Sequence, residues 1–232
     1  MKRWTAALWL VVGLASAPFA LAQEGVRTIV LVRHGHYAAD PKADERLGPG
    51  LSALGVAQGH LAGARLAARP GGFDALHSSP MQRARDTSAA IAQALPDARV
   101  EVLDDLAECT PPTRRADIMA REKPEDLATC QAQLERLFSR IAQPSPGASR
   151  TELFVCHGNV IRYLATRALG VDPQAWLQFS VGHASITTIR VKADGSMQVI
   201  AVGDVGHLPP NLQSGSSADP ERDLAPAALP VP

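Results

Sequence analysis

The feature that most constrains the fold of this chain is a run of five aliphatic or β-branched residues, 28–32, that ends in Arg33, His34 and Gly35. A continuous apolar run of this length is typical of a strand buried on both faces of an α/β sheet. Open α/β sheets bind their ligands at the carboxyl ends of the strands, where this guanidinium and this imidazole stand. A guanidinium fits a phosphate and an imidazole is a nucleophile near neutral pH. The stretch therefore predicts either a phosphate pocket, with Gly35 letting the backbone approach the ligand, or two side chains that only close the sheet.

The rest of the chain alternates between apolar runs and segments with helical spacing of apolar residues. Such alternation predicts an α/β fold, a three-layer sandwich with a mostly parallel sheet and helices on both faces. A hairpin through Gly195 would add an antiparallel edge to that sheet. The predicted strands are 73–78, 100–103, 152–156, 186–191 and 197–202, and the predicted helices are 51–68, 79–95, 124–141 and 160–169.

The two ends of the chain differ in composition from the middle. Residues 1–22 combine the basic pair Lys2 and Arg3, an apolar stretch and small residues before Gln23, which predicts a signal peptide and a periplasmic location. Residues 208–232 are rich in Pro, Ser, Asp and Ala and predict a disordered tail. The single domain would thus cover residues 23–207. In an oxidising compartment Cys109 and Cys130 could form a disulfide.

Charged or imidazole side chains follow four of the predicted strands. Arg33 and His34 follow the first, Arg83 the second, Glu108 the third and His157 the fourth. Because the carboxyl ends of parallel strands meet at one edge of a sheet, we expect these five side chains to lie around one pocket. A formal net charge of +0 gives no indication of nucleic-acid binding.

This set of side chains suits phosphoryl transfer, which depends on positioning and on neutralising charge. Arg33 and Arg83 can hold the phosphoryl oxygens, and a protonated His157 can donate to them. His34 can attack phosphorus with one ring nitrogen while the other nitrogen donates to a backbone acceptor. Glu108 can protonate the leaving oxygen and then take the proton of the attacking water. The chemistry requires neither a metal nor another cofactor, and we expect none.

The motifs Arg33-His34-Gly35, Arg83, Glu108 and His157-Gly158 resemble those of the histidine phosphatase superfamily, which has the phosphoglycerate-mutase-like fold. The likeness extends over residues 26–209. Within the superfamily, the segments 77–84, 156–163 and 184–187 are similar to the phosphoglycerate-mutase-like serine/threonine protein phosphatases of mitochondria.

The resemblance implies a phosphohistidine on His34, phosphate held by Arg33, Arg83 and His157, and Glu108 as the acid. Two positions depart from the family pattern. Asp40 stands where many members have Asn, and Ala107-Glu108-Cys109 replaces the commoner Arg-Glu-Gly. Three neighbouring carboxylates remain alternatives to Glu108, namely Glu101, Asp104 and Asp105.

The sequence predicts an exported phosphatase for phosphomonoesters, with a phosphoprotein or a phosphorylated small molecule as substrate. Phosphoserine or phosphothreonine in proteins and a phosphosugar of envelope metabolism are the two candidate substrates. A mutase and an inactive module that binds phosphorylated ligands are the other candidate functions. We expect no nucleic acid and no membrane as partner after signal cleavage, and the oligomeric state stays open.

Two further residues, Cys156 and Arg162, have two interpretations each. Cys156 and Arg162 fit the Cys-x5-Arg pattern of cysteine-dependent phosphatases, which would make the thiol the nucleophile, although a buried strand-end cysteine is the simpler reading. Arg162 would otherwise be a solvent-exposed helix residue. His183 could line the rim of the pocket.

Overall fold

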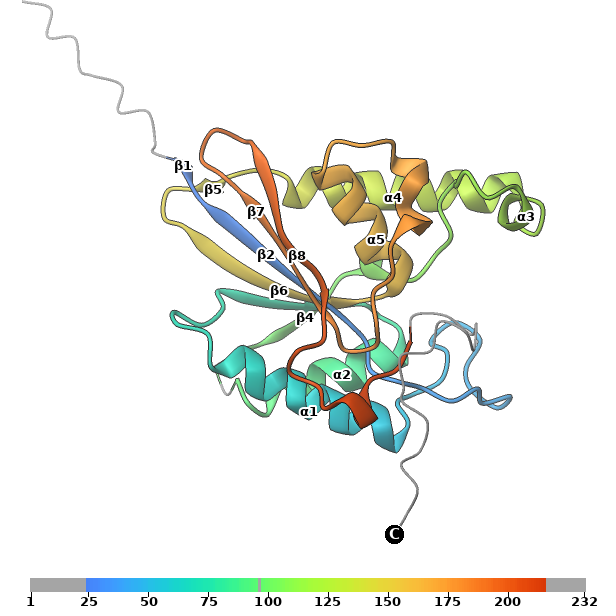
Figure 1. The fold of residues 1–232 in the computed structure, drawn as a ribbon, viewed down its shortest axis with the longest axis horizontal. Coiled ribbons are helices and arrows are strands. Elements are labelled where there is room, and N and C mark those ends of the chain that lie inside the picture. Colours follow the sequence, from blue (N-terminus) through green and yellow to red (C-terminus); the bar gives the residue numbers. More distant parts are fainter. Residues whose placement is uncertain (1–23, 96, 216–232) are drawn as a thin grey trace, which may run out of the picture.

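The computed structural model describes residues 24–95 and 97–215. Its centre is a six-stranded sheet in the order β4-β3-β6-β2-β7-β8 (Figure 1). The predicted mixed sheet is confirmed, since β4, β3, β6 and β2 are parallel to one another and β7 and β8 run antiparallel at one edge. The six strands are β2 (Arg27–Arg33), β3 (Ala75–Ser78), β4 (Val100–Val102), β6 (Arg150–Cys156), β7 (Ile186–Val191) and β8 (Met197–Asp204).

The helices cover both faces of the sheet, as Figure 1 shows, with α1 and α2 on one face and α4 and α5 on the other. They are α1 (Ala53–Ala67), α2 (Gln82–Ala92), α4 (Pro124–Ile141) and α5 (Gly158–Ala168), beside a short α3 (Ala116–Met119). A two-stranded sheet of β1 (Glu24–Gly25) and β5 (Ser145–Pro146) and 3-10 turns at Asp104–Leu106, Pro173–Gln178 and Pro210–Leu212 complete the fold.

The continuous apolar run of β2 follows from its central place. Ile29 and Leu31 belong to the core between the sheet and helices α4 and α5, whereas Val30 and Val32 belong to the core on the α1 and α2 side. Successive side chains of a strand point to opposite faces, so a strand covered on both sides needs apolar residues at every position. The sequence could therefore identify this strand from composition alone.

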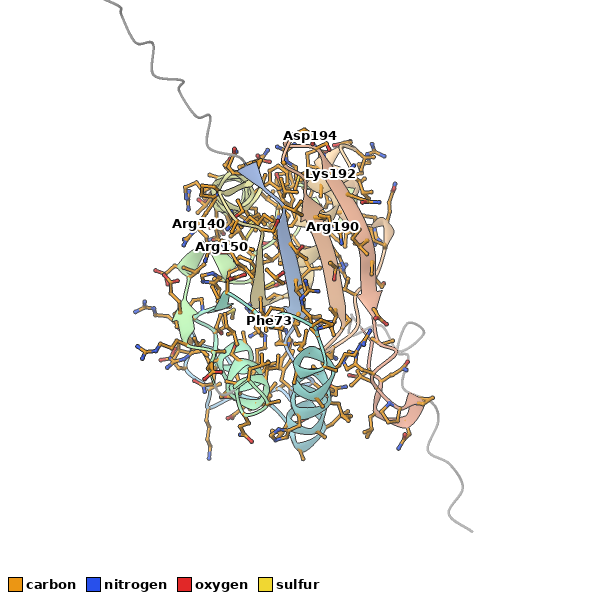
Figure 2. All side chains as sticks on the ribbon, turned by 90° about the vertical axis from the view of Figure 1, so that its left-hand side faces the viewer. Phe73, Arg140, Arg150, Arg190, Lys192 and Asp194 are labelled. Atoms are coloured by element: carbon orange, nitrogen blue, oxygen red, sulfur yellow. A yellow bond between two sulfur atoms is a disulfide. The ribbon has the colours of Figure 1, made fainter. Side chains whose placement is uncertain are left out.

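The strand register brings the ends of the central strands together. Arg33, the last residue of β2, pairs with Cys156, the last residue of β6. Ser78, which ends β3, lies opposite Val155 of β6. The loops that follow β2, β3 and β6 therefore start side by side. Figure 2 shows the opposite side of the molecule, with Arg150 at the start of β6, Arg140 near the end of α4 and Arg190 near the end of the antiparallel strand β7.

Close packing against α1 explains the glycine at position 35, whereas the sequence predicted that it lets the backbone approach a ligand. A Cβ at Gly35 would lie 2.5 Å from the carbonyl oxygen of Gly55 in the first turn of α1. Real Cβ atoms do not come that close to a carbonyl oxygen, so the glycine allows the loop after β2 to pass directly against α1. The side chain of Ser52 caps this helix by accepting a hydrogen bond from the Gly55 amide.

The predicted start of the tail at residue 208 is too early. Leu208 and Ser214 are buried, and the carbonyl oxygen of Leu212 accepts a hydrogen bond from Gln58 of α1. Residues 208–215, here called the C-terminal segment, are thus part of the domain. The segment lacks a hydrophobic pattern because polar contacts, which composition does not reveal, attach it. The predicted signal peptide and residues 216–232 lie outside the described residues.

Two other features concern particular segments. A disulfide joins Cys109 and Cys130, which ties the loop after β4 to helix α4. Within residues 24–95 and 97–215, none of the helices combines the length and the apolar character needed to cross a membrane.

Candidate active site

The hydrogen-bond partners of His34 determine which of its two ring nitrogens carries the proton. Nδ1 lies 2.8 Å from the carbonyl oxygen of Gly35, which can only accept, so Nδ1 carries the proton. Nε2 is left with a free lone pair, and it accepts a hydrogen bond from Nε of Arg83 at 3.1 Å. An anion attracted to the Arg83 guanidinium would therefore meet the unprotonated nitrogen of His34.

Burial also keeps His34 neutral. Its side chain is almost fully enclosed, and the pKa of His34 lies well below its ordinary value because of desolvation and because His157, Arg33 and Arg83 are close. The neutral form, which alone can act as a nucleophile, is thus present down to acidic pH.

His157 lies beside His34. The ring centroids of His34 and His157 are 5.0 Å apart. Ser79 Oγ accepts from the Met81 amide and lies 2.7 Å from Nε2 of His157. Because Ser79 Oγ already accepts a hydrogen bond, its own proton can be donated to Nε2 of His157. Nδ1 of His157 then carries the proton of the neutral ring.

The surroundings of His157 in the structure disfavour the expected protonation. Its pKa lies well below the usual value because the ring is fully buried and because Arg83 and Arg33 are near. The imidazole is therefore neutral and donates only through Nδ1, which has no hydrogen-bond partner within the described residues. A bound dianion would favour the protonated form, since opposite charge raises the pKa of an imidazole.

The carboxyl group of Glu108 stands next to this imidazole. Its Oε2 lies 3.8 Å from Nδ1 of His157, while Oε1 accepts a hydrogen bond from the Asn159 amide in the first turn of α5. Desolvation raises the pKa of Glu108, and the Asn159 amide, Arg33 and Arg83 only partly offset this. Since Oε1 accepts from the backbone, Oε2 is the oxygen that can carry the proton.

The other three carboxylates considered for this role lie elsewhere. Glu101 is largely exposed and pairs with His77. Asp105 forms an ion pair with Arg136 on helix α4, and Asp104 lies in the 3-10 turn before Glu108. The loop after β4 therefore brings Glu108 to His157. The disulfide at the neighbouring Cys109 restrains this loop.

Arg33 completes the group of side chains. Its Nη1 donates to the carbonyl oxygens of Val181, at 2.9 Å, and Gly215, at 3.2 Å. Burial lowers the pKa of Arg33 to about 10, so the guanidinium remains charged at neutral pH. A Cβ on Gly158 would come within 3.4 Å of Arg33 Nε, so a glycine at the start of α5 leaves room for the guanidinium. The structure thus brings together the five side chains selected from the sequence.

Cys156 lies in a different environment. It is completely buried in the core between the sheet and helices α4 and α5, and this burial raises the pKa of its thiol. A thiolate nucleophile needs the opposite shift. The environment therefore argues against the cysteine-dependent alternative.

Two residues, Arg162 and His183, are more deeply buried beside the candidate site than the sequence indicated. Arg162 of α5 is buried, not solvent-exposed, and its charge acts on both Arg33 and Glu108. His183 is also buried, with its ring centroid 5.6 Å from that of His34. The five-residue spacing in Cys156-x5-Arg162 was the available signal for Arg162. Asp40 is exposed and accepts from the amide of Lys42.

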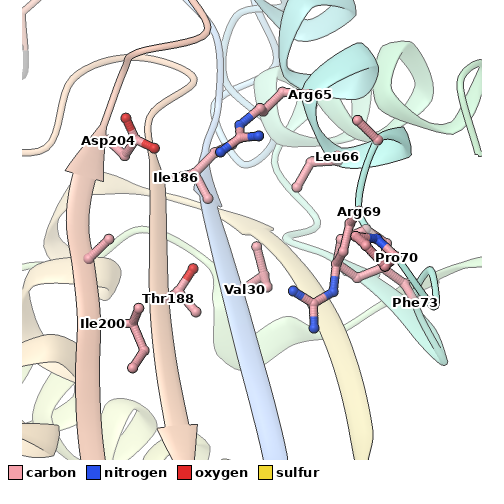
Figure 3. A pocket seen from close by; sticks show the side chains of 12 residues that line it. Val30, Arg65, Leu66, Arg69, Pro70, Phe73, Ile186, Thr188, Ile200 and Asp204 are labelled. Atoms are coloured by element: carbon pink, nitrogen blue, oxygen red, sulfur yellow. The ribbon is translucent and has the colours of Figure 1, made fainter.

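A separate groove of about 370 Å³ lies between the end of α1 and strands β2, β7 and β8 (Figure 3). Arg65 and Arg69 form one wall, and Val30 and Ile186 lie on its floor. None of the five candidate residues lines this groove, so it is distinct from the pocket around His34. In the part of the chain that the structure describes, no group of three or more His, Cys, Asp or Glu residues could hold a metal ion.

The chain belongs to the histidine phosphatase superfamily. The model of branch 1 of that superfamily matches residues 29–113 and 112–204. This confirms the resemblance seen in the sequence motifs.

Two of the most similar curated relatives carry the same name. The chain is 37% identical over 190 residues to the mitochondrial serine/threonine-protein phosphatase Pgam5 of Caenorhabditis elegans, covering 80% of this chain and 65% of that protein. It is 32% identical over 194 residues to human PGAM5, covering 81% of this chain and 66% of that protein. The chain thus spans somewhat less than two thirds of the length of these relatives.

Solved structures show the same fold. Phosphoglycerate mutase from Plasmodium falciparum superposes with a TM-score of 0.56 and 25% identity, over 80% of this chain and 95% of that one. The alpha-ribazole phosphatase of Shigella flexneri gives a TM-score of 0.61 at 18% identity, over 76% of this chain and 96% of that one.

The relatives overturn one prediction. Their names place them in mitochondria, which contradicts the periplasmic location inferred from residues 1–22. A basic start followed by an apolar stretch does not by itself specify the compartment.

Proposed function

We propose that the chain is a metal-independent phosphomonoester hydrolase that forms a phosphohistidine on His34. The observation that carries this proposal is the fixed tautomer of His34, whose Nδ1 donates to Gly35 and whose Nε2 faces Arg83. A neutral imidazole with an oriented lone pair beside a buried cation suits attack on phosphorus. Phosphoserine or phosphothreonine in a protein is the substrate that the names of the relatives support.

In the first step Nε2 of His34 attacks phosphorus and the bond to the ester oxygen breaks. Glu108 gives its proton, held on Oε2, to the departing oxygen, so that the product leaves as an alcohol. Arg33, Arg83 and the N–H of His157 bind the phosphoryl oxygens as charge moves between them. The first products are the alcohol and N-phosphorylated His34.

In the second step a water molecule attacks phosphorus and the P–N bond breaks. The carboxylate of Glu108 accepts the proton of this water, which regenerates the acid for the next cycle. Inorganic phosphate leaves and His34 returns to its starting form. A mutase would deliver the phosphoryl group to a second hydroxyl instead of water.

The test is a phosphate-release screen over phosphoserine and phosphothreonine peptides, sugar phosphates and p-nitrophenyl phosphate. We expect release from the phosphopeptides that EDTA does not reduce, and an acid-labile phosphoryl group on the protein after rapid quenching. His34→Ala should lower kcat by about two to four orders of magnitude, because covalent catalysis is lost.

The matched control is His60→Ala, a histidine on the exposed face of α1. Full activity in His34→Ala would disprove the covalent route. Binding of phosphopeptides without release of phosphate would show an inactive module instead. Release from sugar phosphates alone would replace the proposed substrate with the phosphosugar alternative.

A further inference from the structure

His183 lies in the same cluster of side chains as His34. Its ring centroid is 5.6 Å from that of His34 and 5.4 Å from that of His36, and its side chain is buried. It precedes Ala184, whose φ of 52° is in the left-handed region and whose amide donates to the carbonyl oxygen of His34. A non-glycine residue in this conformation indicates that surrounding contacts hold the turn that carries His183 in place.

The C-terminal segment determines the orientation of this imidazole through a chain of hydrogen bonds. Gln58 Oε1 accepts from the His36 amide, which identifies the other end of the Gln58 side chain as the NH₂ group. That NH₂ group donates to Ser214 Oγ at 3.0 Å. Nδ1 of His183 lies 2.8 Å from the same Oγ, and the amide of His183 donates to the carbonyl oxygen of Ser214.

Because Ser214 Oγ already accepts from Gln58, its own proton is available for Nδ1 of His183. His183 then carries its proton on Nε2. This nitrogen is buried and has no hydrogen-bond partner within the described residues. A buried N–H group without a partner is costly, so this group, in a ring close to His34, is available to an acceptor that binds there.

The same arrangement occurs once more in the pocket. Ser79 and His157 form a serine–imidazole pair in which the hydroxyl contacts one nitrogen and the other nitrogen lacks a partner. The rings of His157 and His183 both lie close to His34, with centroids 5.0 Å and 5.6 Å away. Nearby Arg33 and Arg83 help to lower the pKa of His183 to about 2, after the larger effect of burial, so it is a neutral donor.

We propose that His183 is a further substrate-binding residue, whose Nε2–H, oriented by Ser214, donates a hydrogen bond to an oxygen of the phosphoryl group. The inference rests on the proposed function for its substrate class. It also makes the C-terminal segment part of the active site, because Ser214 orients His183 and Gly215 accepts from Arg33.

The test measures binding of inorganic phosphate by calorimetry, together with hydrolysis of p-nitrophenyl phosphate. His183→Phe keeps a planar ring but removes both nitrogens, and we expect it to raise the Kd for phosphate and the KM each about 10-fold. His183→Gln places an amide NH₂ where Nε2–H stands and should recover most of this loss. Ser214→Ala should raise the same Kd by about 3-fold, since the donor remains but is less well oriented.

The control is His60→Phe, the same change on the exposed face of α1, which should leave both constants unchanged. Thermal unfolding of each variant shows whether it is folded. An unchanged Kd in a folded His183→Phe, or a His183→Gln as weak as His183→Phe, would overturn the inference. If His34→Ala hydrolyses as well as the unmodified protein while His183→Phe still weakens phosphate binding, the proposed function fails and the assignment of His183 stands.

Discussion

The two ends of strand β2 carry arginines in contrasting surroundings. Arg27, at the start, donates to the carboxylate of Glu152 and to the carbonyl oxygen of Arg140. Arg33, at the end, donates to the carbonyl oxygens of Val181 and Gly215 and forms no ion pair with a carboxylate of the described residues. Both guanidinium groups are largely buried, so the difference lies in charge pairing.

The carboxylates near the two ends also differ in their surroundings. At the start of β2, Glu152 also lies 3.9 Å from His77, and His77 lies 3.2 Å from Glu101. At the end of β2, the pocket leaves Glu108 Oε2 and His157 Nδ1 without hydrogen bonds among the described residues. A buried charge without an ionic partner destabilises a protein, so the Arg33 guanidinium, which forms no ion pair within the described residues, supports the proposal that an anion binds at this end.

The largest expected effect is a difference in activity between variants of the two arginines. Arg33→Met should lower kcat/KM at least about 100-fold, because the cation that we propose to bind the phosphoryl oxygens is lost. It should leave the free energy of unfolding unchanged or higher, since a buried unpaired charge is removed. Arg27→Met should keep kcat/KM within about twofold and lower the free energy of unfolding by about 1–3 kcal/mol, because Glu152 loses its partner.

Urea unfolding and p-nitrophenyl phosphate kinetics measure both quantities for the two variants. The comparison would be wrong if Arg33→Met were the less stable protein and kept its activity. The identical substitution on one strand makes each variant the control for the other.

A smaller effect concerns the pH dependence of the pocket. The lowered pKa of His34 keeps the proposed nucleophile neutral down to acidic pH, and the raised pKa of Glu108 keeps the proposed acid protonated to higher pH than usual. Both shifts favour activity at mildly acidic pH, with kcat/KM decreasing as pH rises through the pKa of Glu108. In Glu108→Gln this alkaline decrease should disappear and kcat should be about 100-fold lower. A Glu108→Gln profile that keeps the decrease would assign it to another group.

The smallest effect is on acid stability at the other end of β2. Burial opposes the ionisation of Glu152, but His77 and Arg27 outweigh it and lower its pKa to about 2, from an ordinary value of 4.5. The ionised carboxylate therefore stabilises the protein above about pH 4.5, and this contribution decreases as pH falls toward about 2. The stability difference between the unmodified protein and Glu152→Gln should decrease between pH 6 and pH 3, as measured by urea unfolding. Glu101→Gln, at an exposed position, should show a smaller change.

The sequence was informative where a local pattern of residues was enough to predict the structure. The apolar run ending in Arg33 and His34 identified the central strand and its functional end, because only a strand covered on both faces needs apolar residues throughout. Pro124 marked the start of α4 at the residue where the helix begins. The hairpin of β7 and β8 follows from its alternating pattern and Gly195.

Local patterns failed where contacts come from distant parts of the chain. The C-terminal segment was read as a tail because its composition is polar, yet Gln58, more than 150 residues earlier, holds it in place. Arg162 was placed at the surface because a charged helix residue usually is exposed, whereas here its helix follows directly from the pocket. The protonation of His157 depends on burial and on two arginines from other elements.

The sequence by itself determined the order of strands and helices and the chemical types of side chain at the strand ends, because these depend on local composition and periodicity. The family followed from the resemblance of the motifs at those strand ends. The tertiary structure alone decided which nitrogen of each imidazole carries a proton, which carboxylate reaches His157 and that Ser214 contacts His183. These properties depend on distances of a few ångströms between residues that are far apart in the chain, and on desolvation, which exists only once the chain is folded.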